Sequence, residues 1–244
     1  MRVCISLLVL LIFVTSCKES HKRPREISMV KIETLLSDSL LNVRALDILD
    51  GKVLAATSKG DFYELFDDEI TFGKVNFKNV EGSNIHTFSG NNFRAVAQVK
   101  PFKRSLASLP IAISIESPAK LFKNGRLVYQ ENHPKAFYDS MAFWNDQDGI
   151  AMGDPTDGCI SIIITRDGGE SWRKLSCDNL PRALEGEAAF AASDTNIAIV
   201  GDETWIATGG VASRILYSPD KGKTWEVYDT PIIQGKSTTG MYSL

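Results

Sequence analysis

The sequence predicts an all-β protein, specifically a β-propeller made of repeated four-stranded blades. Three observations lead to this fold class: many short apolar runs, a repeated outline, and a turn motif that is present twice. After residue 30 the apolar residues lack helical spacing, and Gly, Asn, Asp and Pro interrupt them at short intervals. Many short strands with regular turns are typical of β-sandwiches, barrels and propellers.

An internal repeat favours the propeller among these. In four segments an apolar first strand precedes a second strand rich in small residues, which suits strands crowded near a central axis. Equivalent apolar residues of the first strands lie 50, 45 and 49 residues apart, at Leu46, Val96, Met141 and Phe190. A four-stranded blade takes about 40–50 residues. We therefore expect residues 30–244 to form about four blades.

The segment Thr238–Leu244 has the pattern of the opening strand of a further blade. Propellers usually have about 4–8 blades, and a terminal strand without a partner would leave an exposed edge. We therefore expect the chain to be a shortened form of a longer propeller. A small or open ring is the alternative.

The first residues predict export and lipid attachment. An almost wholly apolar run, Cys4–Phe13, is shorter than the about 20 residues of a membrane span, and it fits a signal peptide over residues 1–16. Val14-Thr15-Ser16-Cys17 is similar to a bacterial lipobox, in which the cysteine is acylated. Residues 17–29 would form the lipid anchor and a charged tether on the periplasmic or outer side of an envelope membrane. A plain signal peptide followed by a chance cysteine is the alternative.

The turn motif S/T-x-D-x-G-x-S/T-W occurs twice, 53 residues apart. An Asp at the start of the turn accepts backbone hydrogen bonds, Gly supplies a positive φ, and Trp buries a large ring between sheets. We predict that the motif stabilises hairpins between outer strands and serves neither catalysis nor metal binding. Its structural residues are Thr165, Asp167, Gly169, Trp172, Ser218, Asp220, Gly222 and Trp225.

Two of the four cysteines lie beyond the signal peptide and the lipid anchor, and they suggest a disulfide. Cys159 and Cys177 are each nine residues from Gly168, so one hairpin would bring them opposite each other. Opposed antiparallel residues have Cα atoms about 4.5–5.5 Å apart, which a disulfide can bridge. Export also implies an oxidising environment. Two free thiols are the alternative, and no metal site is predicted.

The two motifs resemble the Asp boxes of the bacterial neuraminidase repeat, which sialidases, some glucan hydrolases and sortilin-type receptors share. The outline of residues 137–172 and 187–225 is similar to that of photosystem II stability and assembly factor-like proteins, a group that includes flavobacterial-type lipoproteins. The resemblance implies a seven-bladed propeller that binds a protein partner rather than turning over a substrate. Only two Asp boxes are present, and residues 30–130 match the repeat in outline alone.

Aligning the repeats places Arg44, Arg94, Asp139 and Ala188 at one position of the first strands. If those strands are innermost, these side chains gather near the axis, where two arginines could hold a carboxylate or an acidic peptide. Ion pairs between blades are the alternative.

The polar loop Gly153–Gly158 lies between two predicted strands. It is either a binding loop on a rigid scaffold or an ordinary turn. Together with the axial position and its neighbours, it completes the set of candidate ligand-binding residues, which comprises Arg44, Arg94, Tyr138, Asp139, Asp154 and Glu187.

These features favour a non-catalytic propeller of the cell envelope that binds or helps assemble a protein or peptide partner, without a cofactor. A net charge of −3 gives no basic surface for nucleic acid. The alternative is a glycoside hydrolase of the sialidase or glucanase type, in which Arg44, Arg94 and Arg214 would hold a substrate carboxylate. The F/Y-R-I-P start of sialidases is absent, and Phe93–Val96 is its nearest approach. A purely structural lipoprotein is the third hypothesis.

Overall fold

The computed structural model describes residues 29–30, 32, 34, 37–65, 72–74, 90–100, 109–190 and 194–244. The chain divides into two units, Met1–Thr34 and Leu35–Leu244, and the described strands all belong to the second. The predicted signal peptide, the lipid-attachment residue Cys17 and almost all of the tether lie outside the described residues. Within the described residues, no helix is long and apolar enough to cross a membrane.

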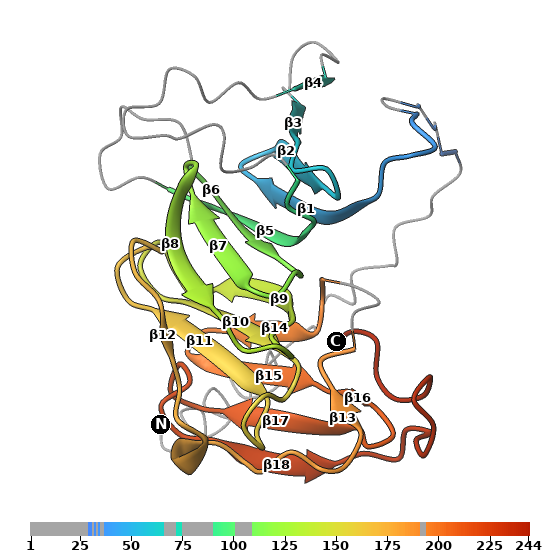
Figure 1. Ribbon diagram of the computed structural model, residues 1–244, viewed down its shortest axis with the longest axis vertical. Coiled ribbons are helices and arrows are strands. Elements are labelled where there is room, and N and C mark those ends of the chain that lie inside the picture. The colour runs from blue at the N-terminus through green and yellow to red at the C-terminus, as the bar shows by residue number, and fades with distance from the viewer. Residues whose placement is uncertain are drawn as a thin grey trace, which may run out of the picture. The chain divides into compact units, whose positions relative to one another are not determined.

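Four antiparallel sheets of four strands each confirm the predicted all-β propeller fold (Figure 1). We call them blades 1 to 4 in chain order; β13 and β16 form a further short pair beside blade 4. The strands are, in blade 1, β1 (Val43–Leu49), β2 (Lys52–Thr57), β3 (Phe62–Leu65) and β4 (Phe72–Lys74); in blade 2, β5 (Phe93–Val99), β6 (Leu109–Ser114), β7 (Ala119–Lys123) and β8 (Arg126–Glu131); in blade 3, β9 (Tyr138–Phe143), β10 (Gly149–Gly153), β11 (Ser161–Thr165) and β12 (Arg173–Lys174); and in blade 4 and its short pair, β13 (Glu187–Ala188), β14 (Ile197–Val200), β15 (Glu203–Ala207), β16 (Gly209–Gly210), β17 (Arg214–Ser218) and β18 (Glu226–Asp229).

The blades pack face to face in chain order, and the first strands β1, β5, β9 and β14 contact one another in that sequence. Side chains alternate between the two faces of a strand, so a middle blade must be apolar on both faces. In β11, Ile162 and Ile164 pack in the core shared with blade 4, whereas Ile163 packs in the core shared with blade 2. This double burial explains why the middle of β11 is continuously apolar.

The two Asp boxes have the hydrogen bonds expected of their residues. Asp167 accepts from the backbone N–H (3.0 Å) and the hydroxyl (2.6 Å) of Ser171, and Asp220 accepts from the same two groups of Thr224 (2.8 and 2.7 Å). Although partial burial opposes ionisation, these bonds lower the pKa of both carboxyl groups. Local hydrogen bonding therefore accounts for both aspartates.

The Asp boxes also hold neighbouring blades together. Lys123, at the end of β7, donates to the backbone carbonyl of Gly168 in the box of blade 3 (2.8 Å). Arg166 of blade 3 in turn donates to the backbone carbonyl of Lys221 (2.5 Å). Lys221 occupies in the box of blade 4 the position that Gly168 occupies in the box of blade 3. One backbone group of each box thus accepts a charge-assisted hydrogen bond from the preceding blade.

The first strand of blade 4 differs from the prediction. It is split into β13, which pairs with β16, and β14, which pairs with β15. Phe190 was expected to match Met141 but lies outside any strand, with a positive φ of 57° and its ring 4.5 Å from that of Tyr242. Residues 189–190 and 194–196, which lie between the two pieces, belong to no strand, and no local pattern in the sequence marks this interruption.

The prediction of a further strand at Thr238–Leu244 is wrong. The segment forms one isolated bridge, between Gly240 and Gly209, and the N–H of Leu244 donates to the carbonyl of Thr195 (3.0 Å). Its described backbone hydrogen bonds therefore return to the region of blade 4 instead of opening a new sheet.

Cys159 and Cys177 form the predicted disulfide, with a Cα–Cα distance of 5.5 Å. The register differs by one residue from the symmetric arrangement, since Ile163 pairs with Lys174. The β11–β12 ladder ends before the cysteines, and Cys177 begins the short 3₁₀ helix η4 (Cys177–Asn179). The bond thus connects the chain ahead of β11 to the chain beyond β12.

We expect replacement of both Cys159 and Cys177 by serine to lower the free energy of unfolding by about 3 kcal/mol, because the bond constrains a loop of 18 residues in the unfolded chain. Urea denaturation without reductant measures the difference. The wild-type chain treated with reductant serves as the control and should match the double variant. Equal stability of the oxidised wild type and the variant would contradict this prediction.

Candidate functional site

Three of the four residues aligned at the axial position share one backbone feature. The register of β1 with β2 shifts at Arg44, and the register of β5 with β6 shifts at Arg94. In the register of β9 with β10, Asp139 has no paired residue. Each is therefore the extra residue of a β-bulge, a feature that re-aims a side chain. Ala188 is regularly paired with Gly209, so the fourth member of the alignment lacks this feature.

The bulges of blades 2 and 3 bring Arg94 and Asp139 together. The Nε of Arg94 lies 2.8 Å from Oδ1 of Asp139, and the two side chains are only 3% and 0% exposed. The structure thus contains the ion pair between blades that the sequence left open as an alternative to ligand binding. Nη2 of Arg94 and Oδ2 of Asp139 are buried and have no hydrogen-bond partner. Arg44 is exposed.

Two further carboxyl groups, which are partly buried, lie near this pair. Burial raises the pKa of Asp139 to about 6 in spite of Arg94, and burial together with the charge of Asp139 raises the pKa of Asp194 to about 9. Burial also raises the pKa of Asp154, which accepts a hydrogen bond from the N–H of Ala189 (2.8 Å). Asp194 was not predicted, because Ser193-Asp194-Thr195 reads as an ordinary polar turn in the sequence.

Glu187 is buried and fully engaged within blade 4. Its carboxylate accepts from Nη2 (2.7 Å) and Nε (3.1 Å) of Arg214, from the hydroxyl of Thr208 (2.7 Å) and from the N–H of Leu184 (2.8 Å). This network fixes β13 to the start of β17. The same network occupies Arg214, one of the three arginines that a sialidase-type site would require.

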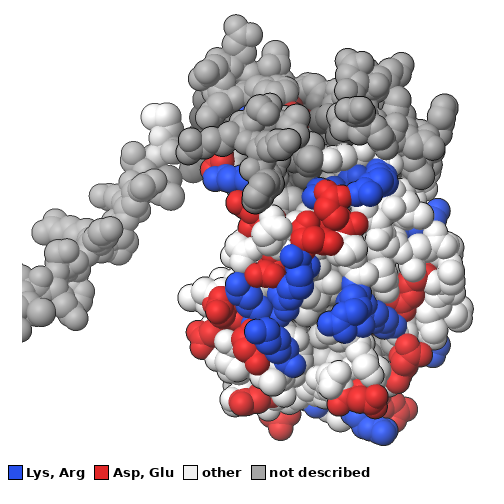
Figure 2. Space-filling model, turned by 90° about the vertical axis from the view of Figure 1, so that its left-hand side faces the viewer, with Lys and Arg blue, Asp and Glu red and all other residues white. Residues whose placement is uncertain are grey.

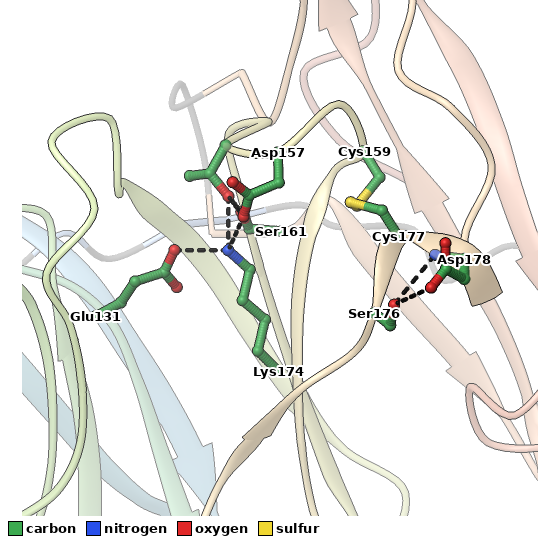
Figure 3. Close-up of a disulfide and its surroundings, with 9 residues drawn as sticks. Glu131, Asp157, Cys159, Ser161, Lys174, Ser176, Cys177 and Asp178 are labelled. Carbon is green, nitrogen blue, oxygen red and sulfur yellow. Dashed lines mark hydrogen bonds and ion pairs between the residues drawn. A yellow bond between two sulfur atoms is a disulfide. The ribbon is translucent and has the colours of Figure 1, made fainter.

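Tyr138 belongs to a buried network that joins blades 2 and 3. Its hydroxyl donates to Glu131 (2.7 Å), which also accepts from Nζ of Lys174 (2.6 Å). Although burial opposes ionisation, these bonds lower the pKa of Glu131. Lys174 also donates to Thr156 (2.6 Å) and Asp157 (3.3 Å) (Figure 3). The loop Gly153–Gly158 is thus held by Lys174, and the disulfide follows it directly in the chain.

An open pocket of about 630 Å³ lies where this loop meets blade 2 and the region before β13. Asp154 and Glu187 are the two predicted site residues that line it. Four chain segments line the pocket, and its other lining residues are Ile115, Ser117, Pro134, Lys135, Ala136, Phe137, Pro155, Leu184, Gly186 and Ala188. Polar and apolar atoms contribute about equally to the lining of the pocket.

Gly153 shapes the wall of this pocket. A Cβ at this position would lie 2.1 Å from the backbone oxygen of Phe137, a distance that no side chain tolerates. The glycine lets that oxygen accept the N–H of Asp154 (2.8 Å). This close approach places Phe137 and Asp154 side by side in the pocket.

Charged side chains of both signs are interleaved on the face shown in Figure 2. Ion pairs between neighbouring blades include Lys123 with Glu170 (2.7 Å) and Lys174 with Glu131 (2.6 Å). The described residues of this face form no basic stripe of the kind that binds nucleic acid. Groups of His, Cys, Asp and Glu able to hold a metal are absent from the described part of the chain.

No protein-family model matches the chain, and no curated protein matches it. Similar solved structures include YCF48 from Cyanidioschyzon merolae (10% identity, TM-score 0.40, 67% of this chain covered), YCF48 bound to D1 peptide (18%, 0.45, 86%) and an N11 neuraminidase-like protein of A/flat-faced bat/Peru/033/2010 (11%, 0.37, 78%). The chain spans 47%, 62% and 57% of the lengths of these three chains, respectively. The propeller assignment rests on the four sheets and their packing.

We expect the free energy of unfolding to fall as the pH rises from about 6 to about 9, because Asp139 and Asp194 hold their protons more tightly in the folded chain, whereas the carboxyl groups with lowered pKa values are ionised in both the folded and the unfolded state over this range. The stabilisation is complete below their ordinary pKa of 3.8. It is lost as the pH passes through about 6 for Asp139 and about 9 for Asp194. Urea denaturation across this pH range measures the slope.

Asp194→Asn should remove the part of this slope between about pH 6 and pH 9, whereas the exposed control Glu185→Gln should keep it. An unchanged slope in Asp194→Asn would show that Asp194 ionises normally in the folded protein.

Proposed function

We propose that this chain is a non-catalytic binding propeller of the bacterial cell envelope, which holds a peptide segment of a protein partner in the pocket beside Asp154. The single observation that carries the proposal is this pocket of about 630 Å³, which four chain segments of blades 2 to 4 build. Its volume lies within the about 300–1,000 Å³ that is usual for ligand sites.

The pocket offers the contacts that a peptide needs. Phe137, Pro134 and Leu184 provide apolar surface, and the last of these is 48% exposed. Asp154 provides a carboxylate next to them for a basic or hydrogen-bonding group of the ligand. Rigid walls favour affinity because little conformational freedom is lost when the ligand binds.

The ionisable groups near the pocket favour binding over hydrolysis. Arg94 is engaged with Asp139, and Arg214 is engaged with Glu187. A hydrolase of the sialidase type would need such arginines available for the substrate carboxylate. In this chain they instead join neighbouring strands and blades, a role that supports a stable scaffold.

The envelope location is part of the proposal and rests on the lipobox-like sequence ending at Cys17. Binding of the D1 peptide is a property of YCF48, the protein in that solved structure. For the present chain, the peptide class is proposed from the shape and chemistry of the pocket.

The proposal predicts that the chain from Lys18 onward, once immobilised, enriches a consistent family of sequences from a phage-displayed peptide library. Leu184→Lys places a charge on the pocket wall and should weaken binding of a selected synthetic peptide by about tenfold or more. Fluorescence anisotropy with the labelled peptide measures this change. The matched control is Ile233→Lys, at a residue that is 79% exposed and does not line the pocket.

Two results would overturn the proposal. One is a peptide whose affinity is the same for Leu184→Lys and for the wild type, since it would bind elsewhere. The other is failure to enrich any peptide family together with release of sugar from a panel of sialosides and glucans, which would favour the hydrolase alternative.

A further inference from the structure

The sheet of blade 4 has two different faces. Ile206 and Leu216 pack in the core shared with blade 3. Because side chains alternate along a strand, Trp205 and Tyr217 point to the opposite face, where they are paired across β15 and β17. This second face, which we call the outgoing face of blade 4, points away from blade 3.

The outgoing face of blade 4 carries a row of aromatic rings. The ring of Tyr217 lies 5.4 Å from that of Trp205 and 6.2 Å from that of Tyr228. Tyr228 is 49% exposed, and Val200, at the end of β14, is 65% exposed. Large apolar side chains on one face of a sheet mark an interaction surface when nothing covers them.

The repeat shows what such a face does elsewhere in the chain. Aligning the two Asp boxes matches Tyr217 with Ile164 and Ile215 with Ile162. Ile162 and Ile164 are buried because they form the contact of blade 3 with blade 4. The outgoing face of blade 4 therefore consists of the same strand positions that already form an interface one blade earlier.

On blade 1 the described residues leave a face of the opposite kind exposed. Val96 and Met141, which occupy equivalent positions in blades 2 and 3, are only 3% and 7% exposed because each packs against the preceding blade. The equivalent Leu46 is 54% exposed, and Ile48 on the same face is 63% exposed. Ala45 and Leu54 point to the other face and pack against blade 2.

In its described residues the chain thus presents two faces with exposed apolar side chains, one of each of the two types that pack against each other at the three contacts between blades. We propose that copies of this chain associate head to tail, with the outgoing face of blade 4 of one copy on the exposed face of blade 1, around Leu46 and Ile48, of another. Such a contact joins different surfaces, so it either closes into a ring of copies or continues as a chain of copies. The inference is independent of the proposed peptide pocket.

Two face variants test the contact. Val200→Lys with Tyr228→Lys alters blade 4, and Leu46→Lys with Ile48→Lys alters blade 1. All four residues are at least about half exposed, so the fold should tolerate the changes. Ile233→Lys serves as the control. Analytical ultracentrifugation of the chain from Lys18 onward, from 1 to 100 micromolar (on the order of typical self-association constants), measures the mass, and circular dichroism checks folding.

The wild type and the control should sediment as more than a monomer, and each face variant alone as a smaller species. A one-to-one mixture of the two face variants should give a dimer, because one unaltered face of each type remains and forms a single contact. A monomeric wild type throughout would overturn the proposal. So would a monomeric mixture, or dependence on the blade 4 face alone, which would indicate a symmetric contact of that face with itself.

Discussion

The fold depends on one packing constraint, the burial of both faces of the middle blades. A sheet in this position has no solvent side, so its central strands must be apolar at every position instead of every second one. Strand β11 meets this requirement: Ile162 and Ile164 pack in the core with blade 4, and Ile163 packs in the core with blade 2. Small residues such as Ala112 and Ala151 are buried in the second strands of these blades.

Polar residues then fix how the blades sit on one another, since apolar packing alone is not directional. Arg94 with Asp139 does so between the first strands, and Lys123 and Arg166 do so at the outer turns. A buried ion pair contributes little net stability, but removal of one partner leaves a costly isolated charge. The residues that the sequence offers as ligand-binding candidates are therefore partly used as supports between blades.

The pocket results from the same arrangement. Its walls are two segments inside blades 2 and 3 and two segments between successive blades, and they are constrained by the approach of Gly153 to Phe137, by Lys174 and by the nearby disulfide. Rigid loops on a packed scaffold are where binding sites commonly lie. The buried Asp139 and the partly buried Asp154 and Asp194 give this region an electrostatic character that changes with protonation.

The sequence by itself determined the features that depend on local chemistry or on the repeat. These are the all-β class, the four-stranded blades, the two Asp boxes and the pairing of Cys159 with Cys177. Only the tertiary structure decided the interrupted first strand of blade 4, the return of the last residues to that blade, and the partners of Arg94 and Glu187. It also revealed Asp194, whose raised pKa comes from burial and from neighbours distant in the chain. Turn chemistry and strand periodicity are properties of neighbouring residues, whereas burial and ion pairing depend on which segments the fold brings together.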